Sequence, residues 1–192
     1  MENLQIGSAV LQKTALDPFH SIMAYPFVDR PTIVIVVVCD NKVLFVKPAK
    51  GDRWILPQGG ISRSDFTLMG AALREGHQEL GMQKELVLPT RRIVLGECLN
   101  PIPSERGLGY THKQLFFMLL PVRHRDWVKL NDENTRYDWV ASRGHLMALW
   151  GKAAESMSVK LQATCEALRN VASVGLLSWA SNIHEETAPA LA

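Results

Sequence analysis

Apolar stretches alternate with amphipathic segments along this chain. Residues 32–38 are seven β-branched residues in a row, which is typical of a central strand covered on both faces. Asp40 and Asn41 then favour a turn, and residues 43–46 predict the returning strand of a hairpin. Further strands are predicted at residues 54–56, in pieces within 86–99, at 114–120 and at 137–140.

The clearest helix is predicted over about residues 66–80. Asp65 is the expected N-cap and Gly81 the expected C-cap of this helix. Gly59 and Gly60 are expected to break regular structure ahead of it. The positions that recur at helical spacing are Leu68, Ala71, Ala72, Glu75 and Glu79.

The last quarter of the chain is predicted to be mainly helical. The helical pattern begins near Ser142, breaks near Gly151 and continues in a C-terminal helix around residues 159–168. Together with the strands, this order predicts one α/β domain. We expect an N-terminal extension over residues 1–28, the domain over 29–175, and a C-terminal tail over 176–192.

Composition narrows the class of protein without naming a function. The chain has 192 residues, 47% hydrophobic and 21% charged, with a formal net charge of +2, so we expect no stable complex with nucleic acid. The longest apolar run, residues 33–39, is too short to span a bilayer. The three cysteines are scattered and form no zinc motif. Together with the lack of a signal-peptide pattern, this favours a cytoplasmic protein with reduced thiols.

Two carboxylates are the first sign of chemistry. Glu75 and Glu79 are four residues apart, so both leave one face of the predicted helix, one turn apart. Such a pair repels unless a cation lies between the two groups, and oxygen ligands of this kind suit Mg²⁺. The pair alone is equally compatible with a solvated helix face, on which Glu75 pairs with Arg74 or Lys84.

The order of residues from Gly59 to Met82 resembles the Nudix box of pyrophosphate-cleaving hydrolases, G-x5-E-x7-R-E-U-x-E-E-x-G-U, in which U is bulky and apolar. The residues that stand in register with this pattern are Arg74, Glu75, Glu79, Gly81 and Met82.

This chain departs from the box in three ways. The first acidic position is Asp65, and eight residues instead of seven separate it from Arg74. The apolar position is Gly76. Gln78 replaces the first Glu of the Glu–Glu pair, so it offers an amide oxygen without charge. A site that lacks one carboxylate is expected to hold its divalent ions less tightly.

The resemblance extends beyond the box. Residues 54–61 read W-x-x-P-Q-G-G-I, as in RNA pyrophosphohydrolases and asymmetric dinucleoside tetraphosphate hydrolases. Arg30, Glu133 and Lys160 fall where that group has a strand-opening Arg, a late metal-binding Glu and a phosphate-facing Lys. Each is also compatible with an ordinary place on the surface. The strand that begins at Lys113 is similar too, although its polar start is equally typical of a strand end.

The resemblance implies an α/β/α sandwich with a mixed sheet and a loop–helix–loop metal motif. It also implies a hydrolase, dependent on Mg²⁺ or Mn²⁺, that cleaves a phosphoanhydride bond in a nucleoside diphosphate-linked or nucleoside polyphosphate substrate, including an RNA 5′ end. The residues that it assigns to metal are Glu75, Gln78, Glu79 and Glu133, with Arg74 orienting Glu75, and those that it assigns to substrate are Arg30, Gly59, Gly60 and Lys160. The alternatives are a nucleotide-binding or regulatory protein of the same fold with little catalysis, and a purely structural domain.

Overall fold

A six-stranded mixed sheet forms the centre of the computed structural model, which describes residues 30–62, 64–90, 93–101, 112–151 and 158–183. The sheet order is β4-β5-β1-β2-β6, with β3 paired to β1. β1 and β5 are parallel and the other pairs are antiparallel. The strands are β1 Arg30–Cys39, β2 Lys42–Pro48, β3 Gln58–Gly60, β4 Val94–Pro101, β5 His112–Pro121 and β6 Asn134–Val140.

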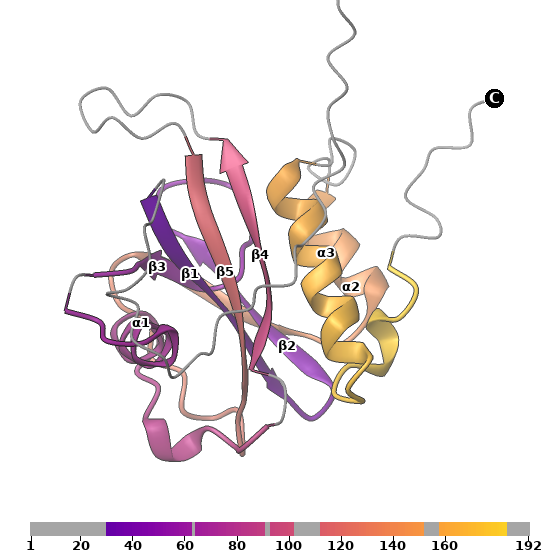
Figure 1. Ribbon diagram of the computed structural model, residues 1–192. Coiled ribbons are helices and arrows are strands. Elements are labelled where there is room, and N and C mark those ends of the chain that lie inside the picture. The colour runs from indigo at the N-terminus through magenta and orange to yellow at the C-terminus, as the bar shows by residue number, and fades with distance from the viewer. Residues whose placement is uncertain (1–29, 63, 91–92, 102–111, 152–157, 184–192) are drawn as a thin grey trace, which may run out of the picture.

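Helices cover both faces of this sheet. α1 lies on one face, and α2 and α3 lie on the other (Figure 1). The helices are α1 Leu68–Leu80, α2 Arg143–Trp150 and α3 Val159–Ala172, with short 3-10 turns η2 Lys84–Leu86 and η4 Ser178–Ala180. The predicted α/β/α sandwich with a mixed sheet is therefore confirmed.

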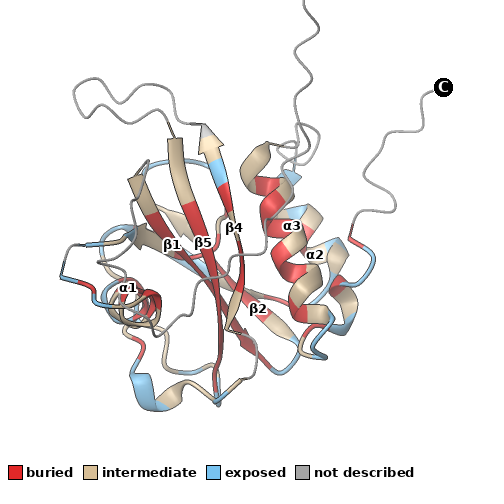
Figure 2. Cartoon of the chain, viewed as in Figure 1, coloured by how far each residue is buried: buried red, intermediate tan, exposed pale blue. Residues whose placement is uncertain are grey.

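The core divides into two layers because successive side chains of β1 point to opposite faces. The odd-numbered residues between 33 and 37 pack in a cluster that contains Leu68 of α1. The even-numbered residues between 34 and 38 pack in a cluster that contains Leu161 of α3. Figure 2 shows the buried central strands between the helices. A strand buried on both faces explains the unbroken β-branched run.

The predicted hairpin turn is present and also anchors the end of the described chain. Asp40 and Asn41 have φ of 49° and 58°, as a type I′ hairpin turn requires. The Asn41 side-chain oxygen accepts a 2.7 Å hydrogen bond from the Ser178 backbone N–H. Beyond this contact, Leu177 and Ile183 are fully buried. Packing on the core therefore extends past residue 175, into the segment that the sequence predicts to be a tail.

The start of α1 differs from the prediction. The helix begins at Leu68, and its N-cap is Thr67, whose hydroxyl accepts a 2.9 Å hydrogen bond from the Gly70 N–H. Asp65 is not the cap because its carboxylate pairs with Arg74. At the other end, Gly81 has the left-handed φ of 70° expected of a C-cap glycine.

The double glycine is also placed differently from the prediction. Gly59 and Gly60 do not break regular structure; they form β3 with Gln58, paired antiparallel to the first half of β1. The strand predicted at residues 54–56 is reduced to a single bridge between Ile55 and Val46. Hydrogen bonding to β1 overrides the weak strand propensity of glycine.

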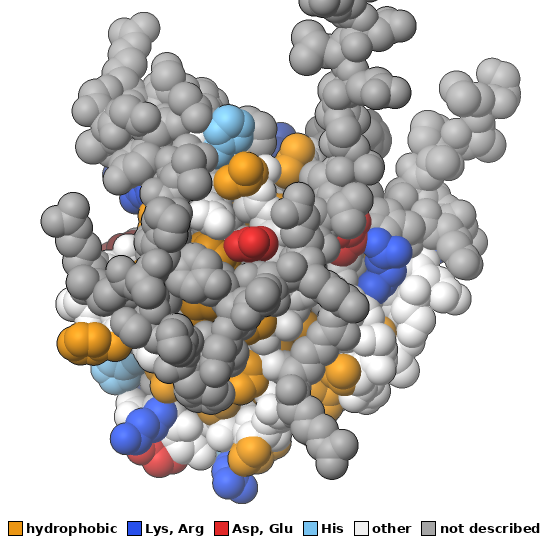
Figure 3. Space-filling model, in the orientation of Figure 1, with side chains coloured by type: hydrophobic (Ala, Val, Ile, Leu, Met, Phe, Trp, Pro, Cys, Tyr) orange, Lys and Arg blue, Asp and Glu red, His pale blue; other side chains and the backbone are white. Residues whose placement is uncertain are grey.

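Charged side chains of both signs are visible on the face seen in Figure 3. Within the described ranges, no helix has the length and apolar character needed to cross a bilayer. The predicted N-terminal extension, residues 1–28, lies outside the described residues.

Candidate functional site

A cleft of about 350 Å³ opens where β1, β3, β5 and α1 meet. Its lining contains most of the residues that the sequence singled out, although these come from distant parts of the chain. Lys113, Thr32 and Gln58 join them. The lining residues are Arg30, Thr32, Gln58, Gly59, Gly60, Glu75, Gln78, Glu79, Lys113 and Glu133.

Strand register places two cations side by side at one end of the cleft. Arg30 of β1 lies opposite Lys113 of β5 in the parallel pair, and neighbouring residues across strands share a face of the sheet. The sequence indicated for Lys113 only the polar start of a strand. Only its register with Arg30 reveals that both residues line one cleft.

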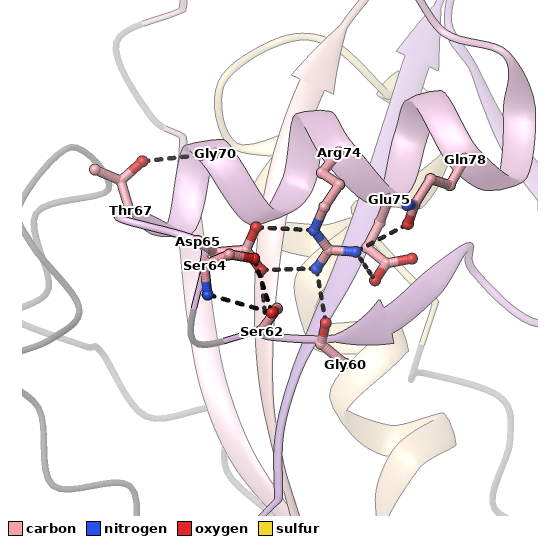
Figure 4. Close-up of polar contacts among 9 residues, drawn as sticks. All are labelled: Gly60, Ser62, Ser64, Asp65, Thr67, Gly70, Arg74, Glu75 and Gln78. Atoms are coloured by element: carbon pink, nitrogen blue, oxygen red, sulfur yellow. Dashed lines mark hydrogen bonds and ion pairs between the residues drawn. The ribbon is translucent and has the colours of Figure 1, made fainter.

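Arg74 contacts two residues of the cleft lining, Glu75 and Gln78 (Figure 4). Its Nε and Nη2 donate to the two Asp65 oxygens at 2.8 and 2.7 Å. Its Nη1 donates to Glu75 Oε1 at 2.6 Å and to Gln78 Oε1 at 2.9 Å. Nη2 also donates to the Gly60 carbonyl at 2.8 Å. Arg74 therefore ties the start of the box, β3 and two side chains of α1 into one unit.

Asp65 fulfils the acidic position despite being shorter than Glu. Burial alone would raise the pKa of this carboxyl, but hydrogen bonds from Arg74 and from the Ser62 N–H hold the pKa below its usual range. The shorter side chain still makes a bidentate contact with Arg74, from a loop that is one residue longer than the box pattern. This departure preserves the ion pair.

The Gly76 departure also has a structural reason. A Cβ built on Gly76 would collide with the terminal methyl group of Met82, and both residues are buried. Met82 thus fills the space that a bulky residue at position 76 would need.

Gly59 lets Glu75 approach the strand. A Cβ on Gly59 would overlap the Glu75 carboxylate, whereas a Cβ on Gly60 would meet nothing within 4 Å. Because the Cα of Gly60 faces open space, the two glycines contribute to the site in different ways. Gly59 makes room for the Glu75 carboxylate, and Gly60 provides a carbonyl oxygen for Arg74.

Glu75 and Glu79 are both buried, with 8% and 6% of their surface exposed. Burial, together with the charge of Glu75, raises the pKa of Glu79 to about 7, although an Asn134 side-chain hydrogen bond of 3.4 Å opposes the shift. A buried carboxylate whose ionisation is opposed by burial and by a neighbouring carboxylate lies in an environment that favours a cation.

The donor set fits a hard divalent cation. Within the described residues, no three His, Cys, Asp or Glu side chains are gathered as a complete metal site. Mg²⁺ generally takes one or two carboxylates and completes its shell with waters and substrate phosphates. Glu75 and Glu79 provide such a pair, and the exposed Glu133 stands at the same cleft.

Lys160 is placed beside the cleft, not in its lining. It is the second residue of α3 and lines a separate cavity of about 50 Å³ with Trp54 and Trp150. Burial and the nearby charge of Lys113 lower the pKa of Lys160 to about 8, and the charge of Glu79 opposes this shift. Its ammonium group is therefore within electrostatic reach of both kinds of charge in the cleft.

The solved structures that share this fold include three hydrolases. They are the dihydroneopterin triphosphate pyrophosphohydrolase of E. coli (19% identity, 71% of this chain and 94% of that one covered, TM-score 0.53), the Ap4A hydrolase of C. elegans (14%, 74% and 96%, 0.53) and a NUDIX hydrolase of Nitrosomonas europaea (20%, 72% and 87%, 0.54). At these identities the likeness concerns the fold alone.

The profile of the NUDIX domain matches residues 29–153. This match covers more than half of the chain, including β1, the Arg74 cluster, the two buried carboxylates and Glu133. The protein therefore belongs to the NUDIX family of pyrophosphate-bond hydrolases.

Proposed function

We propose that this protein is a hydrolase, dependent on Mg²⁺ or Mn²⁺, that cleaves a phosphoanhydride bond in a nucleoside diphosphate-linked or nucleoside polyphosphate substrate. The observation that carries this proposal is the presence of both charges in one cleft, whose lining includes Glu75, Glu79 and Glu133 as well as Arg30 and Lys113. A substrate with several phosphates, together with a divalent ion, would match both kinds of charge.

Glu75 and Glu79 hold the ion in this proposal, and Glu133 completes the set of acidic residues. When bound, the ion neutralises phosphate charge and makes water more acidic. Arg74 fixes the Glu75 carboxylate through its 2.6 Å contact. The amide oxygen of Gln78 accepts a hydrogen bond from Arg74. We therefore propose that Gln78 helps to hold Arg74 against Glu75, in preference to binding the ion itself.

The remaining residues act on substrate and water. Arg30 and Lys113 neutralise phosphate oxygens at the strand ends, and Lys160 adds charge from α3. Glu133 is exposed, so we assign it to removing the proton from the attacking water. The Gly59 and Gly60 backbone gives the phosphates close access to the carboxylates.

A substrate panel tests the proposal. Dinucleoside polyphosphates, nucleotide sugars, small dinucleotides and triphosphorylated or capped RNA ends would be incubated with Mg²⁺ or Mn²⁺ while phosphate and pyrophosphate release is measured. We expect metal-dependent turnover of at least one class. Calorimetric binding of a nucleotide without turnover of any compound would favour the nucleotide-binding alternative, which the uncharged Gln78 motivates.

Glu79→Gln is expected to abolish Mn²⁺ binding at neutral pH, because it removes one of the two buried carboxylates. Titration calorimetry on metal-free protein measures this. Glu85→Gln is the matched control, since Glu85 is exposed on η2 and its variant should bind Mn²⁺ as the wild type does. Unchanged binding by the Glu79 variant would remove Glu79 from the ion site.

Binding of a dinucleoside tetraphosphate in EDTA is expected to weaken as pH rises from 7 to 9. The phosphates favour charged Lys160, so binding raises its pKa above about 8 and takes up a proton. The affinity gained from this charge is present below pH 8 and lost above it. Calorimetry in buffers of different ionisation enthalpy measures the uptake.

Lys160→Arg provides the control, because its guanidinium keeps its charge over this range. That variant should lose the part of the pH dependence centred near pH 8. An identical profile in wild type and variant would place Lys160 outside the phosphate site.

A further inference from the structure

The amide oxygen of Gln58 is a buried acceptor that no described group satisfies. Gln58 opens β3 and lines the cleft, yet its Oε1 has no hydrogen-bond partner. Buried acceptors in native proteins are almost always paired, so an exception calls for an explanation at its own location. Here the location is the cleft that also contains Glu75 and Glu79.

Strand register fixes how this side chain reaches the cleft. Gln58 lies opposite Val34 of β1, and Val34 belongs to the core layer under α3. The next residue, Gly59, faces Glu75 of α1. Gln58 and the carboxylates thus approach one cleft from opposite sides of β3. A backbone hydrogen bond from Gln58 to Glu79 keeps the two residues adjacent.

The chemistry of the lining limits what can satisfy this oxygen. Ionised carboxylates and substrate phosphates have only acceptor oxygens, so neither can pair with it. Arg30, Thr32 and Lys113 of the same lining carry donors, but none of them bonds to this oxygen. A divalent cation, or a water that the cation holds, is the partner that suits an amide oxygen beside carboxylates.

We propose that Gln58 supplies a neutral oxygen to the divalent ion, directly or through a bound water, as an additional member of the ion site. The inference rests on the proposed metal-dependent function. It also explains how the site can work with an uncharged Gln78. The amide oxygen of Gln78 is engaged by Arg74 at 2.9 Å, while that of Gln58 has no partner among the described residues and could bind the ion in its place.

Manganese binding by Gln58→Met and Gln58→Glu tests this role without any assay of activity. Both side chains match Gln in length, and methionine lacks a hard oxygen. We expect the dissociation constant for Mn²⁺, measured by electron paramagnetic resonance on metal-free protein, to rise about tenfold in Gln58→Met. It should fall in Gln58→Glu, which adds charge. Gln83→Met, at an exposed position on the far side of α1's C-cap, should bind as the wild type does.

Thermal unfolding in EDTA separates a role in ion binding from a structural one. Removing an unsatisfied buried acceptor should leave the melting temperature of Gln58→Met unchanged or raised. Adding Mn²⁺ should then raise it less than it raises the wild type. A structural Gln58 would instead give a lower melting temperature in EDTA and an unaltered Mn²⁺ increment, which would overturn the inference.

The two proposals fail in different ways. If wild type binds Mn²⁺ and Glu79→Gln does not, but both Gln58 variants bind within twofold of wild type, the role of Gln58 is refuted and the metal site stands. If wild type binds no Mn²⁺, the metal-dependent function and the role of Gln58 fall together.

Discussion

Glu75→Gln is expected to lower turnover by about 10²-fold or more, because it neutralises an essential ligand or acid–base group. Glutamine keeps the size of the side chain and an oxygen for the Arg74 Nη1 contact of 2.6 Å, so the buried position stays filled. Only the negative charge is lost. Steady-state turnover of the best substrate of the panel, at saturating Mg²⁺, measures the effect.

Two controls make this result specific. The circular dichroism spectrum and melting temperature of Glu75→Gln should match those of the wild type, because the packing around Gly59 and Arg74 is retained. Glu85→Gln changes the same charge at an exposed position and should keep full turnover. Turnover of the Glu75 variant within a few-fold of wild type would show that the buried carboxylate has no part in the reaction.

Gly59→Ala is expected to cost about as much turnover as the loss of Glu75 itself. The added Cβ would occupy the position of the Glu75 carboxylate, so that group must move away from β3 and from Arg74. A displacement of about 1 Å at a reacting group can cost about 10²-fold in rate. The end of a glutamate side chain moves at little cost, so the fold and melting temperature should change little.

Gly60→Ala is the matched control for this second prediction. The same methyl group on Gly60 meets nothing within 4 Å, and the carbonyl that accepts from Arg74 is retained. We therefore expect Mn²⁺ binding close to that of wild type, whereas Gly59→Ala, which displaces the Glu75 carboxylate, should weaken it. If both alanine variants lost Mn²⁺ binding equally, the cause would be a change in the β3 backbone and not the displacement of Glu75. If both kept turnover and Mn²⁺ binding, the Glu75 carboxylate would be able to act from another position.

Local patterns in the sequence predicted most of the fold. The β-branched run predicted a strand buried on both faces, and β1 is such a strand because α1 covers one face and α2 with α3 covers the other. Helical spacing predicted α1, and Gly81 ends it as expected. These features depend on contacts within one element or on the period of apolar residues, which a sequence displays directly.

The structure at the start of the box was harder to predict, because two residues can serve as the N-cap of α1 and because glycine is compatible with more than one backbone conformation. Asp65 and Thr67 are both good N-caps. The choice fell to Thr67 because Asp65 is engaged by Arg74, nine positions along the chain. The role of Gly59 was similarly ambiguous: glycine propensity favours a break, and pairing with β1 makes it a strand.

The sequence by itself determined the family, the fold class and the two carboxylates of α1, because the spacing of Glu75 and Glu79 and the order of the surrounding residues are local properties. Tertiary structure alone decided which distant residues share the cleft. Lys113 reaches it through its register with Arg30 across a parallel pair, and Gln58 through its register with Val34. Register depends on how whole strands pair and pack, so the motifs that contain Gln58 and Lys113 could not by themselves place either side chain at the cleft.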